Sequence, residues 1–360
     1  MADLMTEAWD YSKLQTQYKD FQVPAVKFTV GGKELAGTKA ALSRVEAVLS
    51  LDGASSVRVQ FSDCYDPEKG AFDSDIMGAA VPGKIVELSL GYQSSLEKVF
   101  KGFLSDVRVG VSAEDGYTIE LVALDVRRLM MTDNFRQREY KIKNYSDAVS
   151  EILKRYAKLG SASVDVTNEQ LQDGLLWQNS SDYDFIVKDL IASGRTDREF
   201  FAAVDKIYFR KPCSVTTPIM TLRPGGGLIS LVSDEEYKNV QYEVLGFDPV
   251  SRKPVSGKAD AKADGISDVL GGAGEYYVSD PAVTGAAQAE NRAKSLARQA
   301  LDKSRRAVIR CIGLPQMLPG RYLRIERVDS KVNKKYYISR VTHTFDENGF
   351  RTVVETTGWE

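Results

Sequence analysis

Apolar and polar residues alternate with a period of two through most of residues 22–133. Alternation of this kind predicts β-strands that bury one face. Turn signals at Asp52-Gly53, Pro82-Gly83 and Asp115-Gly116 separate the alternating runs. The strands predicted in this way span residues 25–30, 44–51, 56–61, 85–92, 99–109 and 117–124. Short strands with turns this regular predict a small β-barrel or sandwich over residues 22–133.

Residues 1–21 form a polar lead-in arm with regularly spaced large side chains. These are Trp9, Tyr11, Leu14, Tyr18 and Phe21. Their spacing predicts a short helix or a docking arm. Because a segment without its own core can order on a partner, the arm is also a candidate for wrapping a neighbouring molecule.

The hydrophobic period then changes from two to 3.6. Apolar side chains fall on one helical face, and a second helix begins at Ser181, where Ser181 and Asp184 fit a capping box. A hairpin with a turn at Asp205-Lys206 follows. The two helices and the two hairpin strands span 145–156, 181–194, 199–204 and 207–210. The sequence therefore predicts a compact α+β domain over residues 134–235.

Residues 236–360 return to alternation around one helix and one long polar stretch. The stretch 254–275 is rich in small and polar residues, which predicts a flexible loop. The helix predicted over 285–306 has a narrow face of small residues that permits close packing. The strands predicted here span 240–247, 307–312, 322–328, 336–344 and 351–356. The predicted fold class is thus α+β, mostly β, with two β domains that bracket a small α+β domain.

Composition narrows the chemistry that the chain can perform. Its 360 residues, 43% hydrophobic and 27% charged, are ordinary for a globular protein of two or three domains. The single histidine, His343, leaves little room for a catalytic triad or a histidine-rich metal site. His343 alternates with apolar residues on its strand, so we expect it to be buried and structural. Three cysteines without CxxC spacing predict neither a zinc site nor a disulfide framework.

Two further motifs are explained without catalysis. The glycine run at 225–227 lacks the GxxxxGK[ST] pattern of a phosphate-binding loop. Asp182 and Asp184 suit helix capping, although carboxylates elsewhere leave a cell-wall carbohydrate hydrolase as a minor alternative. We therefore expect no enzyme activity, no cofactor, and no catalytic, cofactor-binding or metal-binding residue. No apolar stretch approaches the ~18 residues of a membrane span, and the acidic amino terminus does not fit a secretory signal.

Positive charge is concentrated in residues 291–342. This segment has 14 Lys and Arg against three Asp and Glu, although the chain has a net charge of −2. Such polarity suits a nucleic-acid surface, but no recognition helix, zinc finger or RNA-stacking motif accompanies it. Contact with an oppositely charged subunit is the favoured interpretation, and nucleic-acid binding is the alternative. The candidate interface or lumen residues are Arg292, Lys294, Arg298, Arg305, Arg306, Arg310, Arg321 and Arg324.

Several short motifs together resemble a known family. GLPQMLPGRYLRI at 313–325 is followed by YISRVTH at 337–343 and GFRT at 349–352, and the middle of the chain has WQ at 177–178 and SDYDFI at 181–186. In this order and spacing they resemble the baseplate hub proteins of contractile phage tails, the late control D family. The amino-terminal hub region of VgrG from type VI secretion is similar. The resemblance extends over most of residues 22–360.

The resemblance implies two tube-like β-barrel domains per chain and a homotrimer. Six barrels would then form one ring that adapts a hexameric tail tube to a trimeric spike. The implied partners are the tail tube protein, a separate spike or tip protein and other baseplate proteins, with a tape-measure protein or passing DNA in the lumen. The sequence lacks the spike that VgrG carries, so we expect the spike to be a separate chain. The implied location is the bacterial cytoplasm during assembly, then a virion tail or a released tail-like particle.

Overall fold

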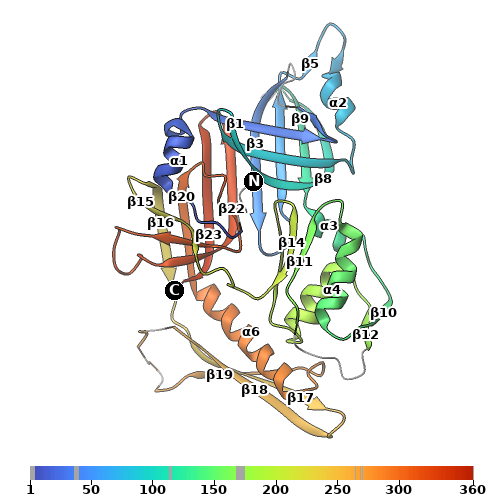
Figure 1. Ribbon diagram of the computed structural model, residues 1–360, viewed down its shortest axis with the longest axis vertical. Helices are drawn as coiled ribbons and strands as arrows, with labels where there is room; N and C mark the ends of the chain where they lie inside the picture. The colour runs from blue at the N-terminus through green and yellow to red at the C-terminus, as the bar shows by residue number, and fades with distance from the viewer. Residues whose placement is uncertain are drawn as a thin grey trace.

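The computed structural model describes residues 5–35, 40–112, 116–167, 175–263, 265–267, 269 and 271–359. Strands dominate the chain and build two six-stranded units that lie side by side (Figure 1). A small α+β unit lies below the first of them, and a helix with a three-stranded sheet extends below the second. The predicted fold class, α+β and mostly β with two barrels, is confirmed.

The first barrel has the strand order β1-β7-β8-β9-β4-β3, with every neighbouring pair antiparallel. These strands are β1 (Pro24–Val30), β3 (Ala41–Ser50), β4 (Ser56–Ser62), β7 (Ile85–Tyr92), β8 (Ser95–Ser112) and β9 (Gly116–Leu124). The alternation is real: Val45, Ala47 and Leu49 of β3 are buried in the core. Asp115, in one of the predicted turns, lies outside the described residues.

Short elements decorate this barrel. They are β2 (Lys33–Glu34), which extends β1, then β5 (Tyr65–Asp66), β6 (Ala71–Phe72) and helix α2 (Ser74–Ala79). Asp73 begins α2 by accepting hydrogen bonds from the backbone N–H groups of Asp75 and Ile76. Among the described residues, β1 and β3 do not pair, so this barrel is open along one side.

The second barrel closes on itself in the order β15-β21-β22-β23-β20-β16, with β16 returning to β15. Its strands are β15 (Pro218–Pro224), β16 (Gly227–Glu235), β20 (Arg305–Ile312), β21 (Tyr322–Ile325), β22 (Lys335–Asp346) and β23 (Gly349–Trp359). This corrects the predicted boundary at residue 235, because residues 218–235 pair with the carboxy-terminal strands. The sequence signal was ambiguous because a long insertion separates β16 from its partner β20.

The two barrels repeat one topology. β1, β7, β8, β9, β4 and β3 correspond in order to β15, β21, β22, β23, β20 and β16, although β1 runs antiparallel to β7 and β15 parallel to β21. Bulges interrupt corresponding strands after Leu42, Leu104, Leu228 and Ile338. When the bulge of β3 is matched to that of β16, the strand registers make Arg58 of β4 correspond to Val308 of β20. Matching the bulge of β8 to that of β22 gives the same correspondence by an independent route.

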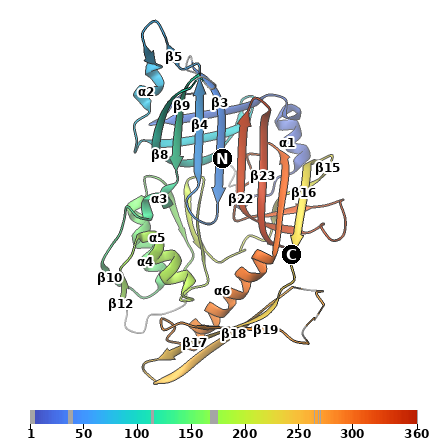
Figure 2. The same ribbon diagram turned by 180° about the vertical axis from the view of Figure 1, so that it is seen from behind.

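The barrels are joined edge to edge. β3 pairs with β22 in antiparallel register, from Val45 opposite Phe345 to Ser50 opposite Arg340. One continuous sheet of eight antiparallel strands, β8-β9-β4-β3-β22-β23-β20-β16, therefore runs through both barrels (Figure 2). We call it the joined sheet.

The α+β unit has its own core beneath the first barrel. Its elements are α3 (Val126–Met130), β10 (Arg138–Lys141), α4 (Tyr145–Leu153), η2 (Lys154–Tyr156), β11 (Ser161–Val164), β12 (Leu175–Gln178), α5 (Asp182–Asp184), η3 (Phe185–Ala192), β13 (Glu199–Ala203) and β14 (Lys206–Arg210). Val126 and Met130 of α3 are buried in this core, which moves its boundary ahead of the predicted residue 134.

The predicted capping of the helix at 181 is confirmed in part. The Ser181 hydroxyl accepts a hydrogen bond from the backbone N–H of Asp184. Asp182, expected to serve as a cap, is instead fully buried and accepts hydrogen bonds from Arg155, Tyr156 and Gln178. Its side chain points into the unit because the first turn packs against η2.

The predicted flexible loop at 254–275 is largely wrong. Residues Lys253–Lys262 form strand β18, which pairs with β17 (Asn239–Asp248), and β17 also pairs with β19 (Gly274–Ser279). Residues 264, 268 and 270 lie outside the described part of the chain. The small residues that indicated a loop instead let helix α6 (Ala286–Ser304) approach the sheet closely.

Glycine makes that approach possible. A Cβ at Gly257 would lie 2.2 Å from the backbone nitrogen of Glu290 in α6. A Cβ at Gly246 would lie 2.2 Å from the carbonyl oxygen of Val283, in the segment that leads into the helix. On the helix side, Ala289 and Ala293 are fully buried against this sheet. The predicted small-residue face of the helix is thus confirmed, with β17 and β18 as its partners.

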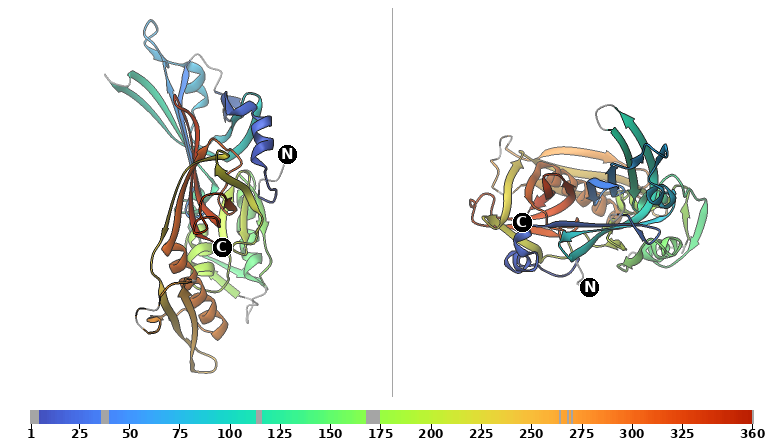
Figure 3. Two further views of the ribbon diagram at one scale, coloured as in Figure 1. Left: turned by 90° about the vertical axis from the view of Figure 1, so that its left-hand side faces the viewer. Right: turned by 90° about the horizontal axis from the view of Figure 1, so that it is seen from above.

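The lead-in arm packs within its own chain. It contains α1 (Tyr11–Gln17) and η1 (Lys19–Phe21), and the Trp9 backbone N–H donates to the Ile219 carbonyl oxygen at 2.7 Å. The ring centroids of Tyr18 and Tyr92 lie 5.1 Å apart, and Gln316 donates to the Tyr18 hydroxyl at 2.5 Å. The short predicted helix is confirmed, and the arm bridges both barrels (Figure 3). Residues 1–4 lie outside the described part.

Gly257→Ala should destabilise the α6 unit by about 1–3 kcal/mol, because the new methyl group meets helix backbone that has no room to move. Hydrogen exchange of the α6 amides and urea denaturation measure the loss. Gly272→Ala is the matched control, since nothing lies within 4 Å of a Cβ there. Equal stability of the two variants would contradict the close packing of α6 on β18.

Candidate functional site

The joined sheet has a polar outer face that faces away from both cores. Alternate residues of its strands project there, including Arg58, Glu120, Arg340, Glu355 and Arg310. The charges have both signs: Arg108 pairs with Glu120 at 2.9 Å and Arg44 with Glu46 at 2.9 Å. This face is suited to broad contact with a polar surface rather than to binding one ion.

Most of the predicted basic residues form ion pairs with acidic residues of the same chain. Six of the eight form ion pairs, namely Arg292–Asp280 at 3.9 Å, Lys294–Glu290 at 2.6 Å, Arg298–Asp197 at 2.9 Å, Arg305–Glu235 at 3.2 Å, Arg306–Glu236 at 3.0 Å and Arg324–Glu326 at 2.7 Å. The structure therefore does not bring the predicted residues into one positive patch. Several of the acids come from segments outside the basic stretch.

Two predicted residues differ from this pattern. Arg310 is exposed on the outer face of β20 and stays a candidate contact residue. Arg321 is fully buried, and its guanidinium donates to the carbonyl oxygens of Glu7 at 2.8 Å and Thr217 at 3.3 Å. As a surface candidate Arg321 is wrong, because the lead-in arm covers it.

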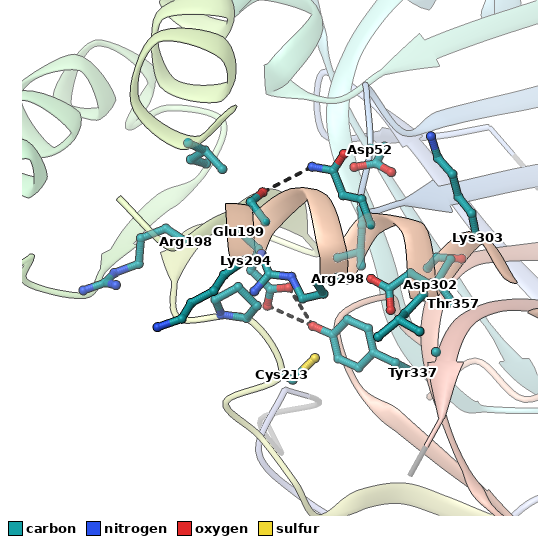
Figure 4. Close-up of a pocket in the computed structure, with 18 of the residues that line it drawn as sticks. Asp52, Arg198, Glu199, Cys213, Lys294, Arg298, Asp302, Lys303, Tyr337 and Thr357 are labelled. Atoms are coloured by element: carbon teal, nitrogen blue, oxygen red, sulfur yellow. Dashed lines mark hydrogen bonds between the residues drawn. The ribbon is translucent and has the colours of Figure 1, made fainter. Parts of the chain in front are cut away.

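A cavity of about 840 Å³ lies where α6, the α+β unit and the second barrel meet (Figure 4). Its charged and polar wall includes Asp52, Glu199, Arg298, Asp302 and Tyr337. Figure 4 shows these side chains converging from α6, β13, β22 and the turn between β3 and β4, which carries Asp52. Sequence reasoning missed this cavity, because the residues come from segments far apart along the chain.

Glu199 is held at the centre of a clamp between the α+β unit and the second barrel. The Tyr337 hydroxyl donates to its carboxylate at 2.7 Å, and Arg210 Nε donates at 2.7 Å. Arg210 also donates to the Gly320 carbonyl oxygen and stacks on the Phe201 ring. Burial raises the pKa of Glu199, and the Arg210 charge opposes that rise. A carboxylate with these fixed partners is a structural link between two units.

Asp302 also lines the cavity and lies in the last turn of α6. Burial raises its pKa to about 6, while Arg298 opposes the rise and Asp52 adds to it. Its carboxyl oxygen would lie 2.7 Å from a Cβ on Gly358, so it packs directly against β23.

His343 is buried, as the alternation of its strand predicts. Its Nε2 lies 3.3 Å from the Met317 carbonyl oxygen and its Nδ1 lies 3.0 Å from the Thr352 hydroxyl. The Thr352 oxygen accepts from the Leu314 N–H, so its own hydrogen is free to be donated to Nδ1. The ring is therefore neutral with the proton on Nε2, and burial lowers its pKa to about 4. It ties the turn at 314–317 to two strands.

Within the described residues, no cluster of three or more His, Cys, Asp or Glu side chains is placed to hold a metal ion. In the same part of the chain, no helix is both long and apolar enough to span a membrane.

Solved structures similar to this chain include phage tail proteins. The tail protein from Neisseria meningitidis MC58 is 12% identical with a TM-score of 0.67, and the match covers 93% of this chain and 97% of that chain. The 43 kDa tail protein of prophage MuSo2 from Shewanella oneidensis is 14% identical with a TM-score of 0.68, covering 92% and 98%.

A third related structure comes from a secretion system. It is an Escherichia coli component of the type VI secretion system that exhibits structural similarity to the T4 bacteriophage tail proteins gp27 and gp5. It is 12% identical with a TM-score of 0.56, and the match covers 93% of this chain and 77% of that chain. At these identities the likeness shows the fold alone, which this chain shares with phage tail proteins.

The chain belongs to the family described as the Alg8 N-terminal domain, whose model matches residues 20–347. No curated protein matches the sequence.

Tyr337→Phe should lower the free energy of unfolding by about 1–3 kcal/mol, because it leaves the buried Glu199 carboxylate with one hydrogen bond fewer. Urea denaturation at pH 7 measures the change. Tyr276→Phe is the matched control, since Tyr276 is 57% exposed. A Tyr337→Phe protein as stable as the control would contradict the clamp.

The neutral His343 should make the fold lose stability in mild acid. Its pKa is about 4 when folded against an ordinary 6.5, so only the unfolded chain binds the proton between these values. The loss begins below pH 6.5 and reaches about 3 kcal/mol near pH 4. His343→Gln should flatten this part of the stability curve, and an unchanged curve in that variant would show that other groups cause the loss.

Proposed function

We propose that this protein is the structural baseplate hub of a phage tail or of a phage-tail-like contractile injection particle. The observation that carries the proposal is that one chain holds the same barrel twice, joined edge to edge in a single antiparallel sheet. A repeated unit joined this way is the start of a ring. The tail-hub fold shared with known tail proteins supports the same assignment.

In this proposal three copies form a homotrimeric ring. Three chains with two barrels each supply six barrels, which matches one layer of a hexameric tail tube. The same ring keeps threefold symmetry on its other side, which suits a trimeric spike made by a separate chain. The late control D family is the group of hub proteins to which we assign it.

The proposed partners follow from that position. They are the tail tube protein above, the spike or tip protein below and other baseplate proteins around the ring. The polar outer face of the joined sheet would line the lumen, where a tape-measure protein or DNA passes. The protein would assemble in the bacterial cytoplasm and leave in a virion tail or tail-like particle.

We propose a role without catalysis. The support is that the buried carboxylate best placed in the cavity, Glu199, is held by Tyr337 and Arg210. The nucleic-acid alternative has weaker support, because Arg298, Arg305 and Arg306 are paired with acids of the same chain.

The solution mass of the purified protein should be three times that of one chain. Light scattering over a range of concentrations measures it, and electron microscopy should show closed rings of six densities. A stable dimer, or a monomer at the highest attainable concentration, would contradict a ring that this chain closes by itself.

A further inference from the structure

The joined sheet ends in two strand edges that have no partner strand in the described part of the chain. Within the described residues, β8 pairs with β7 only as far as Phe103, so its segment 106–111 has β9 on one side and no strand on the other. β16 pairs with β15 only at Gly227 and Leu228, so one side of its remaining residues is unpaired. Long unpaired edges are sites where another chain adds a strand.

Apolar side chains are exposed at both edges. Val109 and Val111 of β8 are 45% and 66% exposed, and Ile229 and Val232 of β16 are 61% and 65% exposed. The internal repeat explains the exposure on β8. The β8–β9 and β22–β23 registers show that Val109 of the first barrel corresponds to His343 of the second barrel. His343 is fully buried, whereas Val109 is exposed.

The joint within the chain supplies a template for these edges. In the barrel repeat β22 corresponds to β8, and β3 corresponds to β16. The pairing of β22 with β3 therefore has a counterpart in which β8 of one copy pairs with β16 of the next. Since the eight strands of the joined sheet alternate in direction, its first and last strands run oppositely. A copy rotated about an axis along the strands would meet its neighbour in antiparallel register.

The template also fixes which residues face each other. Thr342 lies opposite Val48 and His343 opposite Ala47 in the joint within the chain. Carried through the repeat, these pairs become Arg108 opposite Asp234 and Val109 opposite Ser233. The next two counterparts are Gly110 opposite Val232 and Val111 opposite Leu231.

The charges at this register are complementary. Within the chain, Arg108 of β8 lies opposite Glu120 of the neighbouring strand β9. Asp234 of β16 lies opposite Arg306 of its neighbouring strand β20. Placing Arg108 beside Asp234 gives a row of alternating charge, Glu120, Arg108, Asp234 and Arg306, across the joint. Opposite charges at facing positions stabilise a strand pair, and like charges destabilise it.

We propose that β8 of one copy pairs with β16 of a second copy in this register, with Arg108 facing Asp234 and Val111 facing Leu231. The inference rests on the proposed function, because it names the joint by which the hub ring closes. The occupant of both free edges is thus another copy of the same chain.

Paired cysteines test the register in the full-length protein. A chain with Val109→Cys and Ser233→Cys, in a Cys213→Ser background, should give covalent trimers on mild oxidation. Facing residues of a strand pair lie within the about 4.4–6.8 Å between Cα atoms that a disulfide accepts. Val109→Cys with Leu231→Cys is the control, because a shift of two residues moves the sulfurs out of reach. Its yield should be about tenfold lower.

A charge exchange tests the same joint without new cysteines. Arg108→Asp should weaken the trimer about fivefold or more per joint, because it places two carboxylates opposite each other. Arg108→Asp combined with Asp234→Arg should restore association. Arg44→Asp is the matched control, since Arg44 also has a partner acid on the same face but lies away from both edges.

The outcomes separate the two claims. A trimer with specific crosslinks and charge rescue supports the joint. A trimer in which the shifted pair crosslinks equally, or in which the double charge exchange fails to rescue, overturns the joint and leaves the ring standing. A wild-type chain that stays monomeric overturns the ring and the joint together.

Discussion

The backbone hydrogen bonds between β3 and β22 are the constraint on which the rest of the structure depends. Each barrel alone would leave a strand edge unpaired, and the six register pairs from Val45–Phe345 to Ser50–Arg340 satisfy one such edge from each. A slip of one residue would turn Ala47 and His343 out of their cores, so the register is strongly specified. The end of β3 is also fixed by Arg127, fully buried, which donates to the carbonyl oxygens of Ser50 and Leu51. That contact connects the joint to the α+β unit.

The fold brings the basic segment of the sequence next to acidic residues from other segments, so the charge imbalance along the sequence does not become a positive surface patch. The basic stretch at 291–342 contributes α6 and several strands, and the acids that neutralise it come from neighbouring elements. Arg305 and Arg306 pair with Glu235 and Glu236 because β20 and β16 are antiparallel neighbours. Arg298 pairs with Asp197 across the junction between α6 and the α+β unit. The imbalance in sequence therefore reflects which segments meet in space.

Local sequence patterns predicted most helices and strands correctly. They could not predict which segments far apart in the sequence pack against each other. The alternation at 337–345 correctly buries His343, and the repeated turns correctly give the strands of the first barrel. The small residues at 254–263 misled the prediction because their partner is a helix thirty residues on, and smallness indicates close packing as well as flexibility. Arg321 could not be recognised as buried, since the lead-in arm that covers it is remote in sequence. The bulges that reveal the barrel repeat depend on register, which no single segment contains.

The exposure of Val109 and Val111 is best understood from the same constraint. Their counterparts at the joint within the chain, His343 and Phe345, are covered because β3 lies beside β22. The local sequence of β8 has the apolar alternation of a strand that is flanked on both sides, as β22 is. In the proposed joint, the barrel that would cover β8 belongs to another molecule. A chain with two equivalent barrels and one internal joint has one free strand edge at each end of the joined sheet, on β8 and on β16. In a closed ring of copies, each of these edges pairs with the complementary edge of the next copy.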